Sequence, residues 1–166
     1  GTGRFVHDVY RKHFLGSGHG DKVGIHERLA ECFRQLRPGE YDLRCINAID
    51  AERGTDAATL GVQAALQSER EGRPWANLPA RILDAIEIGG LGAATHSLVA
   101  AHHTLRDYDY DVCLATLDDL SHDLPKPVVA EATHMRAACL MSTPSAADRQ
   151  TARTTLPGWS DYVILE

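Results

Sequence analysis

Residues 94–127, "ATHSLVAAHHTLRDYDYDVCLATLDDLSHDLPKP", contain the pattern that decides the expected fold. The first half is rich in alanine, and its apolar residues recur at the spacing of one helix face: Ala94, Leu98, Ala101 and Leu105. The alternating Asp and Tyr residues that follow are typical of a turn, and a second apolar helix then runs to two prolines. The segment therefore predicts two helices that reverse direction at the turn "YDYD".

Helical patterns also precede and follow this segment. Apolar residues keep the helical period from Asp21 to Leu36, and a Pro-Gly pair then ends the helix. Further helices are expected within residues 41–54, 55–72, 77–90, 126–141 and 143–156, with Thr55 as an N-cap and Pro79 in a first turn. The C-terminal "PGWSDYVILE" has extended character. About eight or nine helices with short loops predict an all-α fold of antiparallel helix hairpins.

We expect a single helical domain over residues 21–166, preceded by residues 1–20 as a short helix or a flexible tail. Phe5 and Val9 lie at helical spacing near the start, but the glycines of "GSGHG" then interrupt the pattern. The chain starts with "GTG", without an initiator Met, and ends in Leu-Glu. We therefore also expect a domain cut from a longer protein.

Composition narrows the classes of function. The formal net charge of −6 argues against nucleic acid as a partner, because binding to phosphate backbones needs clustered Lys and Arg. No run approaches about eighteen apolar residues, so no membrane span is expected. The four cysteines form no C-x-x-C pair, which favours a reducing, cytoplasmic location. The loop "GSGHGDK" lacks the Gly-Lys-Ser/Thr ending of a phosphate-binding loop, so it does not indicate a nucleotide site. We expect no cofactor.

Residues 94–127 also match a known helical repeat. The tetratricopeptide pattern, of about 34 residues, requires small residues where its two helices meet, an aromatic residue, a large apolar residue and a closing proline. Those places are filled here by Ala101, Cys113, Tyr110, Leu117 and Pro125. The segment therefore resembles a tetratricopeptide repeat.

The match weakens outside these positions. Ser97 and Thr104 replace the Trp and Tyr of the first helix. A second unit over residues 128–161 has Met135 and Thr151 where the pattern prefers a small and a large apolar residue, although Ala147 fits. The resemblance implies a right-handed stack of hairpins, and an irregular helical bundle is the alternative.

In such a stack, the first helix of each unit lines a concave binding surface. The resemblance assigns the following residues to that surface: Thr95, Leu98, His102, Leu105, Arg106, Val129, Ala132, Arg136, Cys139 and Leu140. Among them, His102, Arg106 and Arg136 form a small basic strip suited to carboxylates. We therefore expect an interaction or regulatory domain that binds a protein or an acidic peptide, rather than an enzyme.

A metal site is the competing interpretation. Glu131 and His134 form an E-x-x-H pair on one helix face, and Asp119 and His122 form a shorter analogue before the preceding turn. Together they could serve a helical-bundle enzyme or a small-molecule sensor. A di-iron bundle, however, needs two such pairs on long helices and two further Glu ligands, which this sequence does not supply in that pattern.

Overall fold

The computed structural model describes residues 22–120, 123–142 and 151 of the chain. Every regular element in that part is helical, which confirms the predicted all-α class. In chain order the elements are α2 (Lys22–Leu36), α3 (Tyr41–Asp50), α4 (Gly54–Arg70), the 3-10 turn η1 (Trp75–Asn77), α5 (Ala80–Ile88), α6 (Gly92–Arg106), α7 (Tyr110–Asp118) and α8 (Lys126–Ser142). The predicted N-terminal helix or tail, the helix expected within residues 143–156 apart from residue 151, and the extended C-terminal segment lie outside the described residues.

Two helix starts differ from the prediction. Thr55 is not the N-cap of α4, because the carbonyl of Arg53 already accepts a helical hydrogen bond from Ala57 N–H at 2.8 Å. Pro79 is the N-cap of α5 rather than a first-turn residue, and its carbonyl accepts from Ile82 N–H at 2.8 Å. Both helices therefore begin within two residues of the expected place.

Four helix ends close with the same turn. The residue after the helix cap has a left-handed φ in each: 58° at Glu52, 73° at Gly72, 70° at Gly90 and 62° at Tyr108. At the predicted YDYD turn, Tyr108 N–H donates to Leu105 O at 3.2 Å, and the next amide donates to Thr104 O at 2.9 Å. These are the paired bonds of a Schellman cap, and they reverse the chain within a few residues.

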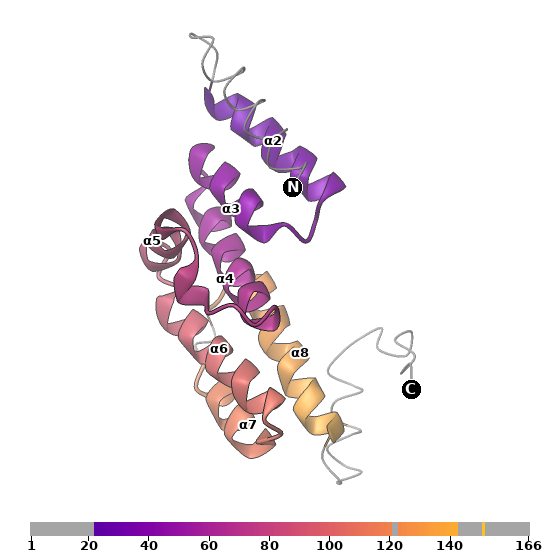
Figure 1. Ribbon diagram of the computed structural model, residues 1–166. Helices are drawn as coiled ribbons and strands as arrows, with labels where there is room; N and C mark the ends of the chain where they lie inside the picture. The colour runs from indigo at the N-terminus through magenta and orange to yellow at the C-terminus, as the bar shows by residue number, and fades with distance from the viewer. Residues whose placement is uncertain (1–21, 121–122, 143–150, 152–166) are drawn as a thin grey trace.

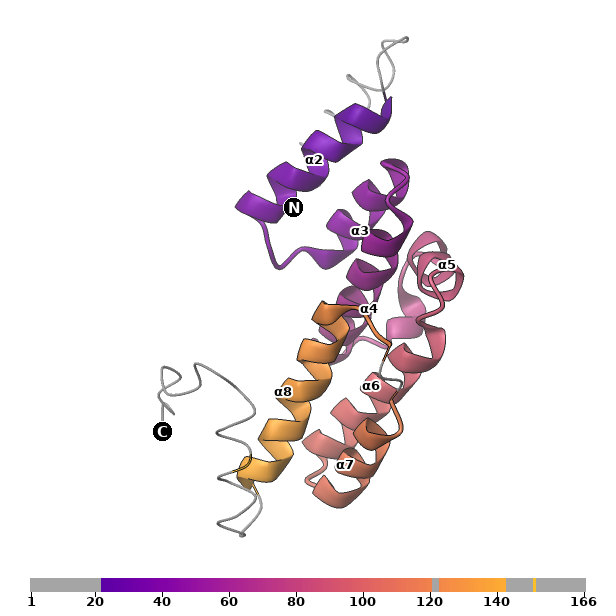
Figure 2. The ribbon, with the colours of Figure 1, turned by 180° about the vertical axis from the view of Figure 1, so that it is seen from behind.

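The helices form an elongated, layered arrangement. Figure 1 shows α2 at one end and α6 with α7 at the other, while α4 lies between these ends. Viewed from behind, α8 runs beside α6 and α7 (Figure 2), and it contacts both as well as α4. α2 packs chiefly on α3, which in turn packs on α4. Among the described helices none alone is long and apolar enough to cross a membrane, and α5 with α6 meets that test only across a bend of 113°.

The core lies where α4, α5, α6 and α8 meet. Its large fully buried side chains include Leu66, Ile82, Leu98 and Val128. A Cβ atom on Gly61 would lie 2.7 Å from Cγ1 of Ile86, so glycine at this position lets α5 approach α4 closely. Small residues thus set the helix spacing, and aliphatic side chains fill the space between helices.

The α6–α7 hairpin buries the residues that the repeat pattern marks as core. Ala101 and Cys113 are fully buried and Leu117 is 2% exposed. The Cys113 thiol donates to Ala101 O at 3.3 Å, which joins the two helices directly. These positions therefore have the close packing that small residues permit.

The prediction that the first helix of each repeat lines an exposed concave surface is wrong at three positions. Thr95, Leu98 and Cys139 are fully buried rather than exposed. The physical reason is that α4, α6 and α8 all contact one another, so α4 and α8 cover much of the face that α6 would otherwise present. An accessible part of that face remains near the C-terminal end of α6, where Arg106 is exposed.

Candidate binding surface

A group of ionisable side chains lies where the C-terminal ends of α4 and α6 meet. We define the basic cluster as Arg70 from α4 and His102, His103 and Arg106 from α6. Cationic side chains are favoured in the last turn of a helix because the helix dipole is negative there. Two helices that end side by side therefore place positive charge at one point on an otherwise acidic chain.

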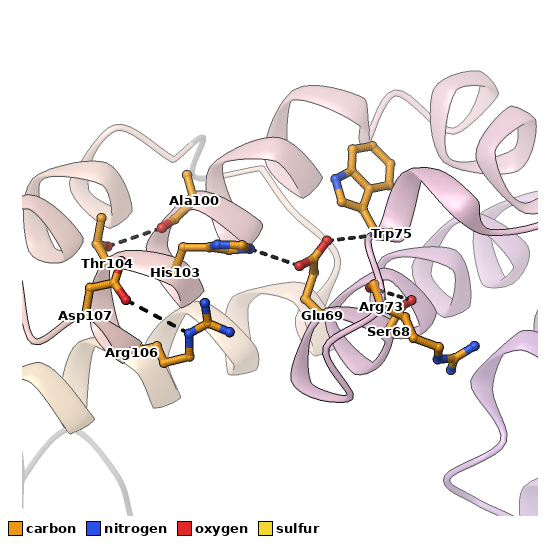
Figure 3. Close-up of polar contacts among 9 residues, drawn as sticks. All are labelled: Ser68, Glu69, Arg73, Trp75, Ala100, His103, Thr104, Arg106 and Asp107. Atoms are coloured by element: carbon orange, nitrogen blue, oxygen red, sulfur yellow. Dashed lines mark hydrogen bonds and ion pairs between the residues drawn. The ribbon is translucent and has the colours of Figure 1, made fainter.

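Glu69 fixes the geometry of this junction (Figure 3). Its carboxylate is 11% exposed and accepts hydrogen bonds from the backbone N–H of Trp75 at 2.8 Å and from His103 Nε2 at 2.9 Å. Burial alone would raise the pKa of Glu69, but the bonds from Trp75 and His103 bring that pKa below its ordinary value. Since an ionised carboxylate can only accept, the proton of this contact lies on Nε2 of His103.

The turn after α4 is held at further points. The Ser68 hydroxyl donates to Arg73 O at 2.9 Å, and the Trp75 ring meets the ring of His96 edge-on, with centroids 4.9 Å apart. These contacts join the end of α4 and η1 to α6. The basic cluster is therefore supported by a fixed turn on its α4 side.

The pKa of His102 reflects its burial and the charges around it. Its side chain is partly buried, and its ring lies edge-on to that of His103 at a centroid distance of 6.0 Å. Burial lowers the pKa of His102, and the positive charges of Arg70, His103 and Arg106 lower it further, against a smaller opposing effect of Glu69. His102 is therefore a neutral imidazole at neutral pH, in a positive local potential.

The two arginines of the cluster differ in their engagement. Arg70 donates to Glu131 of α8 at 2.6 Å, which links the C-terminal end of α4 to α8. Arg106 is 63% exposed, and among the described residues its nearest carboxylate is that of the adjacent Asp107, at 4.0 Å. A contact of that length between exposed groups contributes little, so the Arg106 guanidinium can still bind an incoming carboxylate.

The structure brings together two of the three predicted binding residues. His102 and Arg106 belong to the cluster, whereas Arg136 is paired with Asp118 across the α7–α8 contact. Arg136 follows Glu131 by five residues, so the two side chains project about 140° apart around α8. Arg70 and Glu69 have no distinguishing signal in the sequence, because their role depends on the approach of α6.

The predicted metal ligands do not form a site in the described part of the chain. Glu131 is engaged by Arg70, His134 is exposed, and Asp119 caps the end of α7. His122 lies outside the described residues. Within the described ranges, no three His, Cys, Asp or Glu side chains are placed to hold a metal ion. The glutamate of the E-x-x-H pair on α8 therefore forms an ion pair with Arg70 of α4.

Comparison with protein-family models, curated proteins and solved structures finds no match for this chain. The fold and the site together define an all-α protein of helix hairpins with a basic cluster at the junction of α4 and α6.

Proposed function

We propose that this chain is a helical interaction domain that binds an acidic segment of a partner protein at the basic cluster. The observation that carries the proposal is the placement of two arginines, Arg70 and Arg106, and two histidines at one junction of α4 and α6, in a chain of net charge −6. A local potential of opposite sign to the whole chain favours and orients an anionic partner.

The exposure of the cluster supports a peptide rather than a buried small ligand. Arg106 is 63% exposed and Arg70 is 46% exposed, so both are accessible from solvent. They lie on neighbouring helices, and one extended segment with two carboxylates could contact both. The burial of Ala101 and Leu117 in the α6–α7 hairpin also supports the tetratricopeptide-like stacking that we propose for the domain.

Binding should depend on pH through His102. A carboxylate that approaches the imidazole favours its charged form, which raises the lowered pKa of His102 in the complex. The complex then takes up a proton that the separate molecules do not hold. Affinity should therefore rise as the pH falls from neutral through the pKa that His102 has in the complex.

A labelled oligoglutamate peptide tests the proposal by fluorescence anisotropy. Arg106→Glu should weaken binding at least about tenfold, which corresponds to about 1.4 kcal/mol. Arg73→Glu is the matched control, because Arg73 is 65% exposed, lies in the turn after α4 and does not belong to the cluster. Equal losses in both variants, or no binding by the wild type, would contradict the proposal.

A further inference from the structure

A second concentration of arginine lies at a cavity of about 280 Å³, away from the basic cluster. Arg34 reaches it from α2, Arg44 from α3 and Arg53 from the turn between α3 and α4. Leu60 of α4 and Pro127 of α8 line the cavity with apolar surface. Three arginines from three segments of the chain therefore line one cavity.

Two of these arginines are held in place by acidic neighbours. Arg34 donates to both carboxylate oxygens of Glu31, at 2.8 and 2.5 Å, and Arg53 pairs with Asp56. The hydrogen bond from Arg34 lowers the pKa of Glu31 to about 2, and the charge of Arg53 contributes to that shift. Each guanidinium has five N–H donors, so both arginines keep donors for another anion.

Arg44 differs from the other two because it has no carboxylate partner in the part of the chain that the structure describes. Its Nη1 donates to Pro38 O at 2.5 Å, and its guanidinium carbon lies 5.4 Å from the centroid of the Tyr41 ring. These contacts orient the side chain without neutralising it. With Glu31 and Asp56 as its acidic members, the cavity keeps one positive charge in excess.

We propose that this cavity binds a small phosphate monoester, with the phosphate held by Arg34, Arg44 and Arg53 and the organic group against Leu60 and Pro127. A phosphate has enough acceptor oxygens for three guanidinium groups, whereas a carboxylate has two oxygens and matches one bidentate fork. The volume is close to the lower limit of about 300 Å³ for ligand pockets, which restricts the organic group to a few carbon atoms or one ring.

Such a ligand would also connect α2 to the rest of the molecule. α2 packs chiefly on α3, and the cavity adds residues from α2, α3, α4 and α8 around one ligand. An anion bound there stabilises the docked position of α2, because it binds that arrangement and not an undocked one. Slower amide hydrogen exchange in α2 is thus an expected consequence of binding.

Isothermal titration calorimetry with phenyl phosphate and inorganic phosphate tests the site, alongside hydrogen exchange of α2. Arg44→Gln should weaken binding at least about tenfold, a loss that exceeds the usual effect of one exposed charge. Arg44→Lys keeps the positive charge but loses the bidentate guanidinium group, and should weaken binding less than Arg44→Gln does. Arg37→Gln is the matched control, since Arg37 is paired with Glu40 and does not line the cavity.

The outcomes separate this site from the basic cluster. Arg106→Glu should leave phosphate binding unchanged, so failure of one site does not imply failure of the other. Binding that Arg37→Gln weakens as much as Arg44→Gln would show a general counter-ion effect and overturn the proposal. The proposal would also be overturned if phosphate or phenyl phosphate, added to the folded wild type, gave no measurable heat of binding and no change in the amide hydrogen exchange of α2.

Discussion

Replacement of Leu117 by alanine tests the packing of the α6–α7 hairpin. Leu117 is 2% exposed and belongs to the core cluster, so its side chain is removed from water on folding. Loss of three carbon atoms at about 0.8 kcal/mol per buried CH₂ gives about 2.4 kcal/mol. The cavity left behind adds to this, so the free energy of unfolding should fall by about 3–4 kcal/mol.

Urea denaturation followed by far-ultraviolet circular dichroism measures this change. Val112→Ala provides the control, because Val112 lies on the same helix but is 48% exposed, and its replacement should change stability by less than about 0.5 kcal/mol. An unchanged slope of free energy against urea would show that the loss comes from the native packing. A loss below about 0.5 kcal/mol for Leu117→Ala would refute the burial on which the hairpin rests.

Three further predictions concern the turns, the thiols and the histidine. Glu52→Gly should stabilise the fold by about 0.5–1 kcal/mol in the same denaturation assay, because Glu52 has a φ of 58°; a loss of stability would contradict the left-handed turn. A thiol reagent at mildly alkaline pH should label exposed Cys32 in the native protein but reach Cys45 and Cys139 only on unfolding. The reason is that burial raises the pKa of both buried thiols to about 12. Rapid labelling of Cys45 or Cys139 in the native protein would exclude that burial. Because the folded pKa of His102 lies below its ordinary value of 6.5, the unfolded chain takes up this proton first as the pH falls through 6.5. Acidification therefore destabilises the wild type, and His102→Gln should reduce that loss of stability in pH-dependent melting; an identical loss in both proteins would contradict the lowered pKa.

Local sequence signals were sufficient for the helices and their turns. The helix predicted from Asp21 to Leu36 is observed as Lys22–Leu36, and the turn predicted at YDYD separates α6 from α7. Both depend on residues close in sequence: an apolar period within a helix, and short polar residues at its end. The burial of Cys113 and Leu117 also follows from spacing along one helix.

The parts that sequence could not predict depend on long-range packing. Thr95 is buried because α4 and α8 both contact α6, and the apolar period of α6 does not include this threonine. Arg70 joins the basic cluster because α6 packs against α4, and its ion-pair partner Glu131 lies 61 residues further along the chain. The pairing of Arg136 with Asp118 likewise depends on how α8 packs on α7.

The proposed function requires an acidic segment to bind at the junction of α4 and α6. Backbone amide chemical shifts of the labelled protein, recorded during titration with an oligoglutamate peptide, locate that binding. We expect saturable shifts concentrated at Glu69, Arg70 and residues 102–106, with larger shifts at lower pH and none of this pattern in Arg106→Glu. Shifts centred on other helices, or no saturable shifts in the folded protein, would contradict it.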